Sequence, residues 1–187
     1  QRIADAVTAA GHQVMMTSPN HETGTDRLAE VATKLGWAEE DIVVNLQGDE
    51  PLIPPAVIQQ LVSLLSEDQA AEMATLMTPI HTIEDLLNPN IVKAVAGEFK
   101  QALYFSRAPI PYPRDAFAVD KSVMPEGNYY RHLGMYAYRV KALKTIPTLP
   151  PTTLEQLEKL EQLRPLANGM RILLGIVEQA PGHGVDT

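Results

Sequence analysis

The sequence contains no cysteine, and this absence removes several kinds of chemistry. Without cysteine among its 187 residues the chain has no disulfide framework, no thiol nucleophile and no cysteine-ligated zinc or iron–sulfur centre. No apolar run approaches the ~18 residues of a membrane-spanning helix, and no signal peptide opens the sequence. We therefore predict a soluble, cytoplasmic protein that has no membrane partner.

Basic residues are also scarce. The chain has 15 Lys and Arg against 23 Asp and Glu, which gives a formal net charge of −8 and a pI of about 5.1. This balance argues against a broad nucleic-acid-binding surface, which needs many cations to contact phosphates. If the protein binds phosphate groups, it needs metal ions or a few well-placed arginines. The length and the 45% hydrophobic content are typical of one globular domain.

Apolar periodicity predicts an α/β fold. Strands are expected at 12–16, 41–46, 73–77, 91–96, 101–105, 129–139 and 171–177, and helices at 3–10, 26–35, 54–65 and 152–167. Because the early strands alternate with helices, we expect three layers around a mostly parallel sheet, with strand 41–46 in its centre. The proline-rich stretch 108–127 predicts an extended excursion that forms a small subsidiary lobe.

Both ends of the sequence suggest a piece of a larger protein. The helical spacing of Ile3, Ala6 and Val7 starts without an initiator methionine or a capping residue. At the other end Asp186 and Thr187 suit a helix N-cap, although no helix follows. We expect one domain, residues 1–187, that is truncated at both ends.

Asp49 is the first candidate for chemistry. It lies just after the carboxyl end of strand 41–46, between Gly48 and Pro51 and beside Glu50. Ligands of open α/β sheets bind at that rim, and carboxylates there suit Mg²⁺, which also takes oxygens from substrate phosphates. The alternative is that Asp49 caps the helix that follows.

Asp186 is a second carboxylate that could reach a metal. Gly182 and Gly184 make its segment conformationally permissive, and strand 171–177 leads into it. A helix cap or a mobile tail is the alternative reading of Asp186.

A third cluster opens the helix expected at 26–35. Thr23, Gly24 and Thr25 precede Asp26 and Arg27, so hydroxyls and exposed amides meet at a helix start. Such groups can bind polar ring edges or anions. In the alternative reading Thr25 is a plain N-cap.

The strand at 129–139 carries a fourth cluster. Period-two alternation places His132, Gly134 and Tyr136 on one face, where they could form the floor of a sugar or polyol pocket. A structural histidine is the alternative for His132. Arg107 and Arg114 flank the prolines and could bind a carboxylate, or they are ordinary surface arginines.

The helix expected at 152–167 begins with a capping box at Thr152 and Glu155. Its leucines recur every three residues and predict one buried face, which leaves glutamates on a solvated face. Glu161 and Gln162 can be functional only if that face lines a cleft. The residues concerned are Leu154, Leu157, Leu160 and Leu163, and Glu155, Glu158 and Glu161.

Together these segments resemble the 3-deoxy-manno-octulosonate cytidylyltransferase family, also called CMP-Kdo synthetases. The matching runs, in family order, are 21–27, V-N-L-Q-G-D-E-P (44–51), N-P-N-I-V-K (88–93), A-L-Y-F-S-R-A-P-I-P (102–111), R-H-L-G-M-Y-A-Y-R (131–139), L-E-x-L-E-x-L-E-Q-L-R (154–164) and P-G-H-G-V-D-T (181–187). They cover nearly the whole chain.

The resemblance implies transfer of CMP from CTP to 3-deoxy-D-manno-octulosonate (Kdo), with Mg²⁺ as cofactor, in a cytoplasmic homodimer that supplies lipopolysaccharide synthesis. It implies a fold similar to nucleotide-diphospho-sugar transferases, in which residues 106–140 form a sugar-binding and dimerisation excursion. It assigns Asp49 and Asp186 to the metal and Thr23, Gly24, Thr25, Arg27 and Gln47 to cytidine. It assigns Arg114, His132, Tyr136, Glu161 and Gln162 to the sugar acid, with Arg107 behind them.

Two departures from the family pattern affect these expectations. Thr23 stands where the family usually has serine, a change that keeps the hydroxyl. The family's N-terminal strand and its phosphate-binding loop are not in the sequence, nor is the helix after G-V-D-T, so we expect the isolated piece to be inactive. A cytidylyltransferase for another sugar acid, such as sialic acid, and a non-catalytic nucleotide-binding module remain alternatives.

Overall fold

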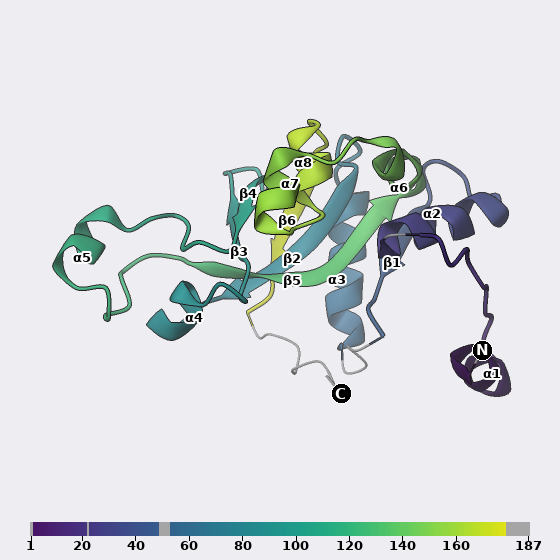
Figure 1. Cartoon of the computed structure of the whole chain (residues 1–187), viewed down its shortest axis with the longest axis horizontal. Coiled ribbons are helices and arrows are strands. Elements are labelled where there is room, and N and C mark those ends of the chain that lie inside the picture. The colour runs from purple at the N-terminus through teal and green to yellow at the C-terminus, as the bar shows by residue number, and fades with distance from the viewer. Residues whose placement is uncertain (1, 22, 49–52, 179–187) are drawn as a thin grey trace.

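A computed structural model describes residues 2–21, 23–48 and 53–178 (Figure 1). Its elements follow in the order α1 (Arg2–Ala9), α2 (Gly24–Lys34), β1 (Ile42–Asn45), α3 (Pro55–Ser66), β2 (Met73–Pro79), α4 (Ile83–Leu87), β3 (Lys93–Ala96), β4 (Ala102–Ser106), α5 (Arg114–Val119), β5 (Tyr130–Arg139), α6 (Val140–Thr145), the 3-10 helix η1 (Ile146–Thr148), α7 (Thr153–Glu158), α8 (Leu163–Ala167) and β6 (Ile172–Ile176).

The sheet is organised around β5. This ten-residue strand pairs with β2 along its length on one edge, and with β1 and β3 on the other. Strand β6 adds to the far edge of β2, and β4 pairs with β3 as an antiparallel hairpin. The predicted α/β class is confirmed, and β1, β2, β3 and β6 share one direction. Because the antiparallel β5 lies among them, however, β2–β6 is the one parallel pair among the described strands.

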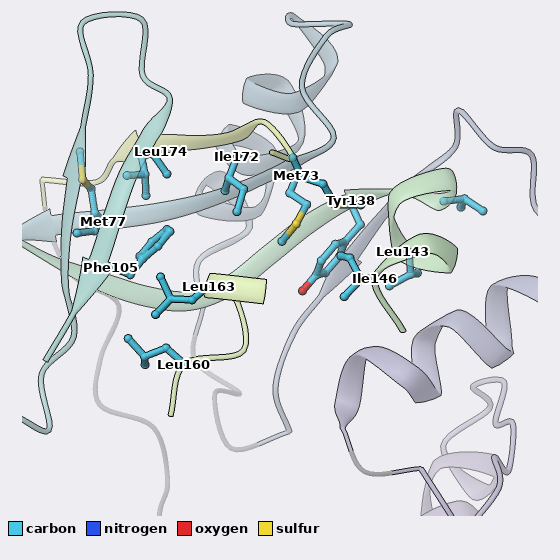
Figure 2. Close-up of a cluster of buried hydrophobic side chains, with 14 of the residues drawn as sticks. Met73, Met77, Phe105, Tyr138, Leu143, Ile146, Leu160, Leu163, Ile172 and Leu174 are labelled. Carbon is cyan, nitrogen blue, oxygen red and sulfur yellow. The ribbon is translucent and has the colours of Figure 1, made fainter. Parts of the chain in front are cut away.

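The predicted three layers are also present. Side chains alternate along the strands: Met135 and Ala137 of β5 face α3, whereas Tyr136 and Tyr138 face the opposite side. Helix α3 contributes Leu61 and its apolar neighbours to the first face. Helices α2, α6 and α8 cover the second face, whose core includes Met73, Phe105, Tyr138, Leu163 and Ile172 (Figure 2).

Strand β1 occupies a different place from the one predicted. It pairs with β5 on one edge only within the described residues, so it is not a central strand. Its apolar run has another cause: Ile42 and Val44 pack toward α3, and Val43 packs toward the opposite core. A strand covered on both faces needs apolar residues throughout, wherever it lies in a sheet.

Residues 12–16 form no strand, contrary to prediction. Val14, Met15 and Met16 are exposed and run as irregular chain between α1 and α2. Apolar composition alone does not make a strand, because the backbone groups also need a partner strand, and none of the described strands pairs with this segment.

The helix predicted over 152–167 is broken in two. Lys159 ends α7 in the left-handed conformation (φ 55°), and α8 starts at Leu163. Pro165 favours the break, because proline has no amide hydrogen to donate to the Glu161 carbonyl and is therefore tolerated in the first turn of α8 but not in the middle of a longer helix. The predicted leucine face is therefore wrong in its first half: Leu157 is 77% exposed, whereas Leu163 is fully buried.

The proline-rich stretch leaves the sheet as an arm (Figure 1). It contains α5, a short helix where an extended chain was predicted. Phe117 of α5 and Tyr129 pack with Ile83 and Leu86 of α4 in a small core of their own. In the described part of the chain, no helix is both long and apolar enough to cross a membrane.

The break between α7 and α8 predicts a contrast between two leucines. Leu163→Ala is expected to lower the free energy of unfolding by about 2–5 kcal/mol, because it opens a cavity in the core. Leu157→Ala, the matched control, is expected to stay within about 0.5 kcal/mol of the parent. Urea unfolding of both variants measures this difference, and equal losses would contradict the broken helix.

Candidate active site

One cavity of about 570 Å³ lies on the face of the sheet opposite α3. It is formed by the start of α2, the end of β1, the middle of β5 and the junction between α7 and α8. Eight of the predicted site residues line it: Thr23, Gly24, Thr25, Gln47, His132, Tyr136, Glu161 and Gln162. The volume is in the range of small-ligand sites.

The start of α2 forms one wall. Thr23 is its N-cap: the Thr23 hydroxyl accepts from the Asp26 amide at 3.2 Å, and the Asp26 carboxylate accepts from the Thr23 amide at 3.1 Å. The reading of Thr25 as the cap is therefore wrong. Because Thr23 does the capping, Thr25 takes no part in the cap and lines the cavity.

The floor is the face of β5 that carries His132, Gly134 and Tyr136, as the period-two pattern predicted. The same alternation adds Tyr138, whose ring stacks on that of Tyr136 with centroids 5.7 Å apart. Burial raises the pKa of both phenols, so each keeps its proton near neutral pH and can donate a hydrogen bond. A Cβ added at Gly134 would meet no other atom within 4 Å, so the floor has an open gap there.

His132 is held firmly in this floor. Its Nε2 lies 2.8 Å from the hydroxyl of Thr75, and its ring meets Phe105 edge-on with centroids 5.1 Å apart. Burial lowers the pKa of the imidazole to about 3, so His132 is neutral at physiological pH. The structural role considered above and a place in the cavity therefore both apply to His132.

The junction between α7 and α8, which follows the break at Lys159, forms the third wall. The residues of the junction turn toward the cavity, where Lys159, Glu161, Gln162 and Arg164 line it. Burial raises the pKa of Glu161, and the nearby Arg164 guanidinium partly offsets this effect. The predicted solvated face is therefore wrong for Glu155, which is buried, whereas Glu161 is exposed and lines the cavity.

Glu155 and Arg164 fix the junction from one side. Arg164 donates to both carboxylate oxygens of Glu155, at 2.9 Å from Nε and 2.6 Å from Nη2, and both side chains are largely buried. These hydrogen bonds hold the pKa of Glu155 below its usual value. The pair joins α7 to α8 across the break.

Glu158 holds the junction between α7 and α8 from the other side. Its carboxylate accepts from the Ser106 hydroxyl at 2.6 Å and from the Arg107 amide at 3.0 Å. The Arg107 guanidinium donates to the Glu158 carbonyl at 2.7 Å and to the Pro89 carbonyl at 2.9 Å. Arg107 therefore ties three segments together and does not line the cavity, which agrees with a place behind the site.

Lys93 supports the same region from beneath. Its fully buried ammonium donates to the carbonyls of Asn88 at 2.8 Å and Ile91 at 2.6 Å, and burial lowers its pKa. Val92 lines the cavity, and its carbonyl accepts from the His132 amide at 2.8 Å. The buried lysine thus shapes a loop that carries one of the cavity walls.

The structure does not bring every predicted residue to the cavity. Arg27 donates to Thr17 and to the Ser18 carbonyl, outside the lining. Arg114 lies on the arm, 86% exposed, beside Asp115. Asp49 and Asp186 lie outside the described residues. Within residues 2–21, 23–48 and 53–178, no group of three or more His, Cys, Asp or Glu side chains could hold a metal ion.

Several lining residues were not predicted. Tyr138 could have been found by carrying the alternation of β5 one step further. The sequence has no signal for Lys159 and Arg164, because their positions depend on the break in the helix. The unpredicted polar residues of the lining are Asn45, Tyr138, Lys159 and Arg164.

Comparisons with known proteins agree with this geometry. The profile of a family described as "Cytidylyltransferase" matches residues 1–172. Proteins called 3-deoxy-manno-octulosonate cytidylyltransferase are 50% identical in Thioalkalivibrio sulfidiphilus and 55% in Cellvibrio japonicus, over 99% and 100% of this chain and 74% of each relative. A solved CMP:2-keto-3-deoxy-manno-octonic acid synthetase in complex with CTP superposes with a TM-score of 0.88 at 43% identity, over all of this chain and 72% of that one.

The buried ion pair of Glu155 and Arg164, behind the third wall, predicts a loss of stability at acid pH. Because the folded-state pKa of Glu155 lies below its ordinary value of 4.5, the carboxylate stabilises the fold above that pH and loses this effect as the pH falls through the folded-state pKa. Glu155→Gln is expected to lower the free energy of unfolding by about 1–3 kcal/mol at pH 7, with a smaller difference from the parent at pH 3.5. Urea unfolding at both values measures it.

Asp115→Asn is the matched control, because it alters an exposed ion pair and should leave stability unchanged. If Glu155→Gln lowered the free energy of unfolding by as much at pH 3.5 as at pH 7, this result would contradict a charged Glu155.

Proposed function

Because this chain belongs to the 3-deoxy-manno-octulosonate cytidylyltransferase family, we propose that it transfers CMP from CTP to Kdo and releases pyrophosphate. The observation that carries this proposal is the single cavity into which separate parts of the chain bring Thr23, Gln47, His132, Tyr136 and Glu161. We further propose that the reaction takes place in the cytoplasm and that its product serves lipopolysaccharide synthesis, in keeping with the resemblance.

The two sides of the cavity suit two different ligands. Thr23, Gly24 and Thr25 of the α2 wall line the cavity together with Gln47, which follows β1, and these residues offer amides and hydroxyls to a cytosine ring and ribose. Arg27 supports this wall by holding the loop before it. We assign this side to the cytidine of CTP.

The floor and the third wall suit a polyhydroxy acid. Tyr136 presents a protonated phenol, His132 a neutral imidazole, and Gln162 an amide that can both donate and accept. Glu161 adds a carboxylate, which can accept from sugar hydroxyls. This mixture of donors and acceptors, on β5 and on the junction between α7 and α8, fits Kdo, which carries several hydroxyls on one ring.

In nucleotidyl transfer the sugar hydroxyl attacks the α-phosphorus in line with the departing pyrophosphate. Catalysis of such reactions depends mainly on positioning and on neutralising charge. The cavity meets the first requirement by fixing the two ligands on adjoining walls. The bonds of Glu155 and Glu158 hold the third wall rigid while the sugar is oriented.

The second requirement implies a metal ion. Two carboxylates, of Asp26 and Glu161, and two cations, of Lys159 and Arg164, line the cavity, so its formal charge is balanced before a triphosphate enters. We propose that Asp49 and Asp186 hold Mg²⁺, which lowers the pKa of the attacking hydroxyl and offsets phosphate charge when bound. The described strands support this, because β1 and β6 run in the same direction and end at the same edge of the sheet.

Product analysis tests the function directly. The intact gene product, supplied with CTP, Mg²⁺ and Kdo, is expected to release pyrophosphate and form CMP-Kdo, detected by mass spectrometry, and to stop when the metal is chelated. Sialic acid in place of Kdo is expected to give little product. Preference for sialic acid, or binding of CTP without turnover on any sugar acid, would overturn the proposal in favour of another transferase or a binding module.

Two variants distinguish an effect on metal binding from an effect on folding in this assay. Asp49→Asn is expected to lower kcat by orders of magnitude with unchanged thermal unfolding, because the amide is a poorer ligand for Mg²⁺ than a carboxylate. Asp5→Asn, on the exposed helix α1, is the control and should keep full activity. Near-normal turnover in Asp49→Asn would remove this residue from the metal site.

We also propose that the protein is a homodimer that associates through the arm. The arm exposes apolar side chains far from the main core, with Val119 at 90% and Tyr112 at 58% of full exposure. Val119→Asp is expected to convert a dimer into a monomer, because it would place a charge in the interface. Light scattering measures the mass, and Val123→Thr is a milder control. A monomeric parent protein would contradict the proposal.

A further inference from the structure

The hydrogen bond between Thr75 and His132 has a direction that the surrounding backbone determines. The pairing of β2 with β5 shifts at this point: Thr75 pairs with Tyr136, and the next residue of β2 pairs with Leu133. Gly134 and Met135 therefore have no partner on β2, and β5 bulges. The Thr75 side chain, fully buried, lies inside this bulge.

Three groups surround the Thr75 hydroxyl. The carbonyl of Met135 lies 2.7 Å from Oγ1, the carbonyl of Leu133 lies 3.1 Å away, and Nε2 of His132 lies 2.8 Å away. A threonine hydroxyl donates one hydrogen and accepts up to two. Both carbonyls can only accept, so each would need the single hydroxyl hydrogen, and the Met135 carbonyl is the nearer of the two.

It follows that Nε2 of His132 carries a hydrogen and donates it to the hydroxyl oxygen of Thr75. If Thr75 donated to Nε2 instead, the buried carbonyl of Met135 would face an oxygen at 2.7 Å with no hydrogen between them. A buried acceptor without a donor costs about 1–3 kcal/mol, so the arrangement in which Nε2 donates is favoured. In a neutral imidazole with a hydrogen on Nε2, Nδ1 carries a free lone pair.

Nδ1 is the ring atom left for a ligand. Among the described residues none makes a hydrogen bond to Nδ1, and His132 lines the cavity. The ring cannot easily turn over, because Phe105 packs edge-on against it and Tyr136 lies next to it with centroids 5.4 Å apart. The neutral state of the ring follows from its burial.

We propose that Thr75 is a positioning residue that holds His132 as the Nε2–H tautomer, so that Nδ1 accepts a hydrogen bond from a hydroxyl of the substrate. The identity of that substrate as a sugar acid rests on the proposed function, whereas the tautomer itself does not. The acceptor at Nδ1 complements the phenols of Tyr136 and Tyr138, which donate. His132 therefore selects a hydroxyl at its position rather than a carboxylate, which has no hydrogen to give.

The tautomer is measured by nitrogen NMR of the ¹⁵N-histidine-labelled protein without substrates. The His132 signals are identified by their loss in His132→Asn, and they are expected to show a protonated Nε2 and an unprotonated Nδ1 from pH 6 to pH 8. Thr75→Ser, which keeps the hydroxyl, is expected to give the same pattern. Thr75→Val, which has the same shape without the hydroxyl, is expected to give a mixture of tautomers. A parent protein with hydrogen on Nδ1, or an unaltered pattern in Thr75→Val, would overturn the proposal.

Kinetics of the same variants test the consequence for the substrate. Thr75→Val is expected to raise KM for Kdo about tenfold, the equivalent of one hydrogen bond, with KM for CTP unchanged and with Thr75→Ser close to the parent. Equal rises in both KM values, or no recovery in Thr75→Ser, would contradict a role through His132. If no sugar acid reacts at all, the function is wrong while the tautomer measurement still stands.

A second pair of variants keeps the test decisive if Thr75→Val fails to fold. Asn at position 132 places its amide oxygen near the place of Nδ1, whereas Gln reaches the place of Nε2. His132→Asn is therefore expected to retain more affinity for the sugar acid than His132→Gln. The opposite order would contradict an acceptor at Nδ1.

Discussion

Strand β5 is paired on both of its edges, and both the core and the cavity depend on this constraint. A strand fixed on two sides cannot slip by one residue without turning all of its side chains to the other face. Met135 and Ala137 are thereby committed to the core under α3, while His132, Tyr136 and Tyr138 are committed to the cavity. The same backbone that stabilises the sheet therefore sets the floor on which the ligands lie.

The wall opposite this floor is stabilised in another way. The junction between α7 and α8 has turn hydrogen bonds, such as that from the Leu163 amide to the Leu160 carbonyl, but no continuous helix, and charged side chains add further contacts. Glu155 reaches Arg164 across the break, and Glu158 reaches Ser106 and Arg107 at the end of β4. Rigidity at the cavity thus comes from buried polar contacts, which are strong only when each partner is present.

The sequence allowed much of this arrangement to be predicted. The alternation along β5 predicted the floor, and the cluster at the start of α2 lines the cavity, with Thr23 as its cap and not Thr25, which the alternative reading named. What failed depended on distant partners. Residues 12–16 are apolar yet form no strand, because none of the described strands lies beside them, and the leucine spacing of 152–167 gave no sign that Lys159 would adopt a left-handed conformation. Family resemblance contributed Asp49 and Asp186, which local patterns left ambiguous between metal ligands and caps.

The gap at Gly134 allows the selectivity of the cavity to change without loss of the fold. The position lies in the middle of the floor, between the imidazole and the phenol, yet a larger side chain there would point into open space and not into the core. Mutations at most buried strand positions damage folding before they alter selectivity. Here the two effects are uncoupled, so a single substitution at Gly134 fills part of the cavity and favours smaller sugar acids while the scaffold stays intact.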